Sequence, residues 1–116
     1  MRAIAIVSIL LLVGLSNRTE AQLLPTKLKI TVIDGLGNFV EGATVSIYGN
    51  EKDYLASENP VATLKTDKGG VVTFKDVKSA PYFVEAKKGD KSNVGEGVQT
   101  ETLSEGKVNK VNTIIE

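Results

Sequence analysis

The sequence contains no cysteine, no histidine and no tryptophan. Without Cys and His there can be no Ser-His-Asp triad, no cysteine nucleophile, and no thiolate or imidazole ligand for a transition metal. Fourteen Lys and Arg residues balance fourteen Asp and Glu residues, so the chain lacks the positive field that is typical of nucleic-acid-binding proteins. We therefore expect no catalytic activity, no cofactor, no metal site and no nucleic-acid partner.

Residues 1–21 are typical of a secretory signal peptide. Arg2 supplies a positive charge, residues 3–15 (AIAIVSILLLVGL) are apolar and uncharged, and Thr19-Glu20-Ala21 places small residues at the two positions that signal peptidase reads. The apolar stretch is shorter than the roughly 20 residues of a membrane-spanning helix. We predict cleavage after Ala21 and export to the periplasm or the medium, with membrane contact only if this segment stays uncleaved.

Residues 22–116 predict a single all-β domain. Apolar residues recur at every second position in five segments, which is the pattern of half-buried strands. Between them, Asp67-Lys68-Gly69-Gly70 predicts a hairpin, and Gly42 indicates a close backbone approach before the second strand. About seven short strands with regular turns predict a two-sheet sandwich. The alternating sets are Leu28, Ile30 and Val32; Ala43, Val45 and Ile47; Ala62 and Leu64; Val72 and Phe74; and Tyr82, Val84 and Ala86.

Three stretches depart from this regular pattern. Apolar residues do not alternate cleanly from Lys107 to Ile115, so we expect either a bulge near Asn112 or contacts on both faces of the last strand, one of them with a partner. Asn50–Pro60 and Asp90–Gly97 are polar, and we interpret both as irregular loops that could carry a binding function.

Three blocks in order give the chain a family resemblance. Residues 34–45 (DGLGNFVEGATV) resemble the D-x-x-G-x-P-[VI]-x-G-A-x-V opening of carboxypeptidase regulatory-like domains, with Phe39 where that family often has Pro. Residues 66–74 (TDKGGVVTF) resemble its T-D-x-x-G-x-[FV]-x-F block, and residues 81–84 (PYFV), after Asp76-Val77, resemble its third block. Small exported proteins of this type are similar to ones common in Bacteroidetes.

This resemblance implies a transthyretin-like (prealbumin-like) Greek-key β-sandwich of about seven strands, in which Phe74 is a core residue and Asn50–Pro60 is an insertion. It also implies a non-catalytic accessory role, as a binding or structural module at the cell envelope. The partner would be an envelope protein or a glycan that the sequence does not identify.

The candidate binding surface combines residues of the two polar stretches with one strand residue. Tyr48 has the opposite parity to Val45 and Ile47, so it is expected to be exposed, and exposed tyrosines can stack on sugars or anchor a protein partner. A carbohydrate- or small-ligand-binding protein is therefore the first alternative function. The predicted surface consists of Tyr48, Tyr54, Leu55, Asp90 and Asn93.

A second alternative is a stalk domain that resembles Cna B-type domains, which form Lys–Asn isopeptide bonds beside a buried acid. The lysine would be Lys27 or Lys29, and the asparagine would be Asn109 or Asn112. The acid would be Glu85. Because Glu85 has the opposite parity to Tyr82 and Val84, we predict that it faces solvent, which argues against the crosslink.

Calcium is the remaining candidate ligand. Asp67, Asp90 and Glu96 lie in predicted turns, where carboxylate oxygens could converge on a hard cation. The chain has no D-x-D-x-D-G spacing, and an Asp in a turn usually caps its own backbone. We therefore expect these carboxylates to serve their own turns.

Overall fold

A computed structural model describes residues 24–96 and 98–116. The predicted signal peptide and Gly97 of the second polar stretch lie outside the described residues. The described part of the chain contains seven strands and one short helix. Their bounds are β1 (Lys27–Asp34), β2 (Thr44–Tyr48), α2 (Glu51–Ala56), β3 (Ala62–Lys65), β4 (Val71–Phe74), β5 (Phe83–Lys88), β6 (Lys91–Ser92) and β7 (Val108–Ile115).

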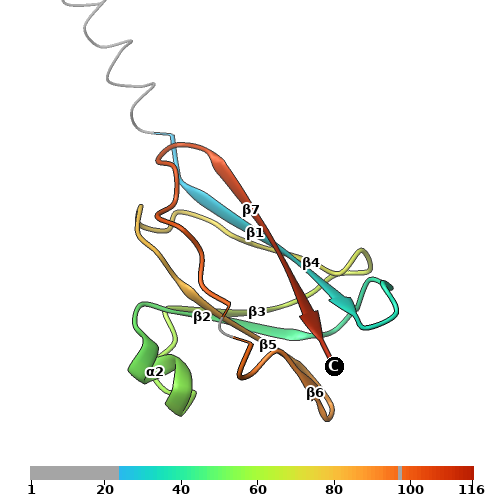
Figure 1. The fold of residues 1–116 in the computed structure, drawn as a ribbon. Coiled ribbons are helices and arrows are strands. Elements are labelled where there is room, and N and C mark those ends of the chain that lie inside the picture. The colour runs from blue at the N-terminus through green and yellow to red at the C-terminus, as the bar shows by residue number, and fades with distance from the viewer. Residues whose placement is uncertain (1–23, 97) are drawn as a thin grey trace, which may run out of the picture.

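The strands form two sheets that pack face to face (Figure 1). One sheet has the strand order β4-β1-β7, and the other has the order β3-β2-β5-β6. The predicted all-β sandwich of about seven strands is thus confirmed.

The alternating apolar residues form the core between the sheets, as the period of two predicts. Leu28, Ile30 and Val32 of β1 have no exposed surface, and Phe74 of β4 is only 2% exposed. Leu64 is the exception, at 43% exposed, because β3 is an edge strand that pairs only with β2.

The last strand pairs in parallel with the first along its whole length. Eight consecutive residue pairs join them, from Lys27↔Val108 to Asp34↔Ile115, without interruption. The predicted bulge near Asn112 is therefore wrong. The strand alternates regularly, but the polar residues Asn109 and Thr113 occupy inward positions together with Val111 and Ile115, while Val108 and Ile114 face outward.

The turn at Asp67–Gly70 reverses the chain, but it does not make a hairpin. It joins β3 of one sheet to β4 of the other, so the hairpin prediction is wrong. Gly70 has φ +76°, and a Cβ at this position would lie 2.8 Å from the carbonyl oxygen of Val32. Gly42 differs from its prediction, because it too has a positive φ (+77°) but no backbone atom would lie within 4 Å of its Cβ.

The first polar stretch is not irregular throughout, because it contains α2. The Asn50 side chain accepts a 2.8 Å hydrogen bond from the backbone N–H of Asp53, which caps the helix. Glu51 and Asp53 lie in the first turn, where negative charge complements the helix dipole. The helix ends at Ala56, and the capping residue Ser57 adopts a left-handed conformation. In Figure 1, α2 lies beside the β3-β2-β5-β6 sheet, at the end where β2 finishes.

Candidate functional site

The five residues of the predicted binding surface do not form one exposed patch. Leu55 is 67% exposed, and Asp90 is also exposed. Tyr48 is only 2% exposed and Tyr54 only 4%, so the predicted exposure of Tyr48 is wrong. Asn93 has no exposed surface at all. Whether Leu55 and Asp90 contact a partner stays a prediction.

Tyr48 is buried because α2 covers the outer face of its sheet. Its side chain points away from the sandwich core, as its parity predicts, but it lies beneath the helix rather than in solvent. The Tyr48 hydroxyl donates a 3.0 Å hydrogen bond to Oε1 of Glu85 on the neighbouring strand β5. Burial is the largest cause of the raised pKa of Tyr48, and its hydrogen bond to Glu85 acts in the same direction.

Glu85 is also buried, which corrects the prediction that it faces solvent. Only 7% of its side chain is exposed. Its Oε2 accepts a 2.6 Å hydrogen bond from the Ser57 hydroxyl, at the end of α2, and lies 3.5 Å from Nζ of Lys87. These contacts join the carboxylate to the residue that caps α2, so they hold the helix against the sheet.

Tyr54 is the apolar anchor of α2. Its ring stacks on Phe83 with 5.5 Å between centroids and packs edge-on against Tyr48 at 5.9 Å. Its buried hydroxyl makes no hydrogen bond to any residue that the structure describes. Burial raises the pKa of Tyr54. The two tyrosines that the sequence offered as contacts for a sugar or a protein partner therefore serve to attach the helix.

Asn93 joins the two sheets from inside the sandwich. Its Oδ1 accepts a 2.9 Å hydrogen bond from the backbone N–H of Ala86, and its Nδ2 donates to the carbonyl of Val84 and the hydroxyl of Thr113. Ala86 and Val84 belong to β5, whereas Thr113 belongs to β7. The residue is thus part of the core structure and not of a contact surface.

The residues proposed for an isopeptide bond do not meet. Lys27 and Lys29 occupy the outward positions of β1, whose inward positions are apolar. Glu85 lies on the outer face of the other sheet, beneath α2. Asn112 is exposed, and Nδ2 of Asn109 donates to the backbone carbonyls of Lys27, Ser104 and Lys107. This geometry contradicts the crosslink in the second alternative.

Of the three carboxylates considered as calcium ligands, that of Asp67 is engaged by its own backbone. Oδ1 of Asp67 accepts hydrogen bonds from the N–H groups of Gly69 and Val71, at 2.9 and 3.0 Å. Within residues 24–96 and 98–116, no three acidic side chains come close enough together to hold a metal ion.

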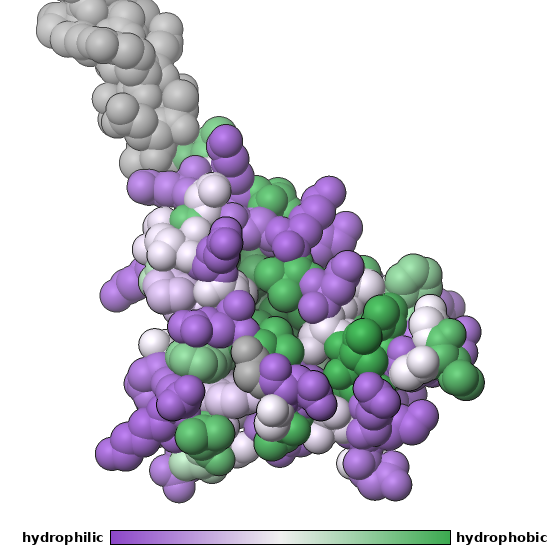
Figure 2. Space-filling model, in the orientation of Figure 1, coloured by the Kyte–Doolittle hydropathy of each residue, from purple (hydrophilic) through white to green (hydrophobic). Residues whose placement is uncertain are grey.

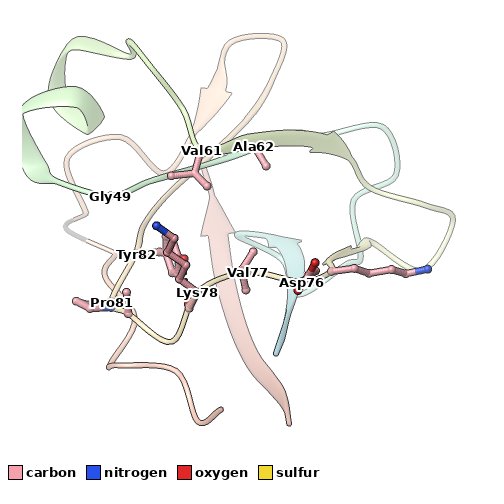
Figure 3. Close-up of a pocket in the computed structure, with 10 residues that line it drawn as sticks. Gly49, Val61, Ala62, Asp76, Val77, Lys78, Pro81 and Tyr82 are labelled. Atoms are coloured by element: carbon pink, nitrogen blue, oxygen red, sulfur yellow. Dashed lines mark hydrogen bonds between the residues drawn. The ribbon is translucent and has the colours of Figure 1, made fainter. Parts of the chain in front are cut away.

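A cavity of about 530 Å³ opens between the start of β3 and the segment that joins β4 to β5. In Figure 3, Val61 and Ala62 lie on one side of it, and residues of the β4–β5 segment lie on the other. Tyr82 is the single aromatic residue in its lining. That side chain is only 4% exposed and donates a hydrogen bond to the carbonyl of Lys78. The cavity therefore has room for a small apolar group but no aromatic surface on which a sugar could stack.

Within the described part of the chain, no helix has the length and apolar character needed to cross a bilayer.

Comparisons with known proteins identify the fold but no family. The structure is similar to the Bacillus anthracis TIE protein (TM-score 0.60, 19% identity, 80% of this chain and 16% of that one). It is also similar to a streptococcal ancillary pilin (TM-score 0.58, 15% identity, 80% of this chain and 32% of that one). The major pilin subunit of Bacillus cereus matches with a TM-score of 0.54 at 16% identity, over 79% of this chain and 30% of that one. The chain thus spans a third or less of the length of these proteins.

No protein family and no curated protein matches the sequence. The resemblance to carboxypeptidase regulatory-like domains and to Bacteroidetes proteins accordingly stays a prediction. The structural likenesses, all below 20% identity, show a β-sandwich fold that is shared with parts of these three proteins.

Proposed function

We propose that this chain is a non-catalytic structural module of an exported protein, and that it carries tension between its two ends at the cell surface. The observation that carries the proposal is the parallel pairing of β1 with β7. Because the two strands run in the same direction, the start of β1 and the end of β7 lie at opposite ends of the sheet (Figure 1).

This arrangement determines how a pulling force acts on the hydrogen bonds. Tension applied before Lys27 and after Ile115 slides β1 along β7, so the bonds of the eight-residue register are loaded together. A force that peels the strands apart from one end loads those bonds one at a time. The module therefore resists extension along the chain without an isopeptide bond.

The structural neighbours support a stalk role, which was the second alternative from the sequence. Two of the three are named as pilin subunits, in which a domain of this fold is one part of a longer chain. Residues 22–116 would serve as such a domain, without the crosslink. The predicted signal peptide would deliver it outside the cell.

Single-molecule force spectroscopy tests the proposal directly. The chain has no cysteine, so cysteine pairs can be introduced as unique attachment points. Leu24→Cys with Glu116→Cys pulls β1 and β7 in shear, whereas Leu36→Cys with Glu116→Cys peels them from one end. Leu24 and Leu36 are both exposed, at 59% and 89%, so neither change disturbs the core.

We expect a several-fold higher unfolding force for the shear pair than for the peeling pair. Equal forces in the two geometries, or a higher force in the peeling geometry, would contradict a role in carrying tension. The intact mass of the same protein should equal the calculated mass, because an isopeptide bond would lower it by one ammonia.

A carbohydrate-binding role remains the alternative, and it has less support because Tyr48 and Tyr54 are buried. Saturable glycan binding that survives Tyr82→Phe but is lost on Leu55→Ser would favour it over the structural role.

A further inference from the structure

The two outer faces of the sandwich differ in what covers them. Helix α2 packs on the outer face of the β3-β2-β5-β6 sheet, where it buries Tyr48 and Glu85. No described segment packs in this way on the outer face of the β4-β1-β7 sheet, and its outward residues are half-buried or exposed. We call the outward residues of β1, β4 and β7, together with the exposed Leu36 and Phe39 of the adjoining β1–β2 loop, the open face.

The open face is basic although the whole chain is neutral. It carries Lys27, Lys29 and Lys110, and its other positions hold only uncharged residues. Lys29 and Lys110 are direct neighbours in the register of β1 and β7. Like charges placed side by side on a sheet are destabilising. An anionic partner would offset this repulsion, because no acidic residue occupies an outward position within β1, β4 or β7. The carboxylate of Glu116 lies at the other end of the sheet, 3.6 Å from the Cβ position of Gly35.

One end of the open face is apolar. Ile33 pairs with Ile114, which is 46% exposed, and Ile33 also bridges to Phe39, which is 66% exposed. Leu36 projects from the same β1–β2 loop and is 89% exposed. In the view of Figure 2, hydrophobic residues gather on the side where this loop lies in Figure 1. Contiguous exposed apolar side chains of this kind mark interaction surfaces.

We propose that the open face binds an anionic lipid bilayer at its surface. Lysines attract acidic headgroups, while Phe39, Leu36 and Ile114 enter the interfacial layer between headgroups and acyl chains. The lysines alone would attract any polyanion. An anionic bilayer, however, offers both negative charge for the lysines and an apolar layer for the exposed apolar side chains of this face. This inference goes beyond the proposed role in carrying tension and does not depend on it.

Co-sedimentation with vesicles tests the proposal, using residues 22–116, the form expected after signal-peptide cleavage. The vesicles contain either phosphatidylglycerol, which is anionic, or phosphatidylcholine alone, which is neutral. The basic variant is Lys27→Gln/Lys29→Gln/Lys110→Gln, and its matched control is Lys52→Gln/Lys65→Gln/Lys78→Gln, which removes three exposed lysines elsewhere. A third variant, Phe39→Ser/Ile114→Thr, alters only the apolar end. A thermal melt of each variant shows that it is folded.

We expect binding to anionic vesicles that weakens as salt rises. The open-face triple variant should lose about fivefold in partitioning per lysine, or roughly a hundredfold in total, while the control triple variant keeps most of its binding. The apolar variant should lose about tenfold at unchanged charge.

The proposal would be overturned by an absence of binding to anionic vesicles, by equal binding to the two vesicle types, by equal losses in the two triple variants, or by binding to soluble polyglutamate in place of vesicles. A concentration-dependent dimer that Phe39→Ser/Ile114→Thr disrupts would also overturn it, because it would assign the face to a second copy of the chain.

Discussion

The hydroxyl of Tyr48 and the carboxylate of Glu85 form a 3.0 Å hydrogen bond on the outer face of the β3-β2-β5-β6 sheet, beneath α2. Tyr48 lies on β2 and Glu85 on β5, so the bond crosses between adjacent strands. Ser57 binds the other carboxylate oxygen from the end of the helix. The six-residue helix α2 is thereby attached to the sheet by a buried polar group as well as by aromatic packing.

Removing the carboxylate should destabilise the fold by leaving two hydroxyls without their acceptor. We expect Glu85→Ala to lower the free energy of unfolding by about 2–3 kcal/mol, and Tyr48→Phe by about 1–2 kcal/mol. The double variant should lose less than the sum, because both changes break the same bond. Lys87→Gln is the control and should stay within about 0.5 kcal/mol, since Lys87 is 46% exposed and its ion pair is weak. Additive losses in chemical denaturation would contradict this coupling.

The positions of Tyr48 and Glu85 show how far alternation along a strand can be interpreted. The period of two correctly separates them from the core residues Ile47 and Val84. It states which face of the sheet a side chain occupies, but not whether another element covers that face. The covering element is α2, a six-residue helix whose single buried residue is Tyr54. A helix of six residues is too short to show a helical period in the sequence.

The other differences between the predicted and the observed structure have a similar cause. Turn residues at Asp67–Gly70 indicate where the chain reverses, but the sheet that the next strand joins depends on packing between distant segments. Asn93 lies among polar and glycine residues, and nothing local indicates its hydrogen bonds to β5 and β7. The strands and the core, by contrast, depend on local alternation and turn chemistry, which is why the sandwich could be predicted.

Gly70 should tolerate no side chain, because both its conformation and its surroundings exclude one. Its φ is +76°, and a Cβ would lie 2.8 Å from the carbonyl oxygen of Val32 and 3.0 Å from the amide nitrogen of Val40. Gly89→Ala is a matched control, since Gly89 has φ +61° but no atom within 4 Å of its Cβ position. We expect about 1 kcal/mol of destabilisation for the control and clearly more for Gly70→Ala. Equal melting temperatures for the two variants would show that the contact with Val32 is unimportant.

Asp34 should make the stability of the domain depend on pH in the acidic range. The backbone N–H groups of Asn38 and Leu36 each donate a 2.9 Å hydrogen bond to its Oδ1, and the bond from Asn38 is the largest cause of its lowered pKa. A carboxyl whose pKa is lower in the folded state stabilises the fold above its unfolded pKa, about 3.9. That stabilisation disappears as the pH falls through the folded pKa.

The isosteric Asp34→Asn variant isolates this effect. Its deficit in unfolding free energy relative to the wild type should be present at pH 6 and should shrink below about pH 4. Urea denaturation at a series of pH values measures the difference, and an NMR titration of Asp34 gives its pKa independently. A deficit that does not change with pH would show that the carboxylate charge contributes nothing at this turn.

Asn93 should be among the residues most sensitive to substitution outside the apolar core. Asn93→Ala would leave the buried Ala86 N–H and Val84 carbonyl without partners and would remove the link to Thr113. We expect a loss of about 3 kcal/mol in chemical denaturation, because each unsatisfied buried group costs about 1–3 kcal/mol. Asn93→Asp should be at least as damaging, since its carboxylate cannot donate to Val84 and would place a charge inside the sandwich.

Asn112→Ala serves as the control, because Asn112 is an exposed residue of β7, and this change should alter the free energy of unfolding by no more than about 0.5 kcal/mol. If Asn93→Ala behaved like Asn112→Ala, the bridge between β5 and β7 would not be a structural element, and the second polar stretch would again be a candidate contact surface.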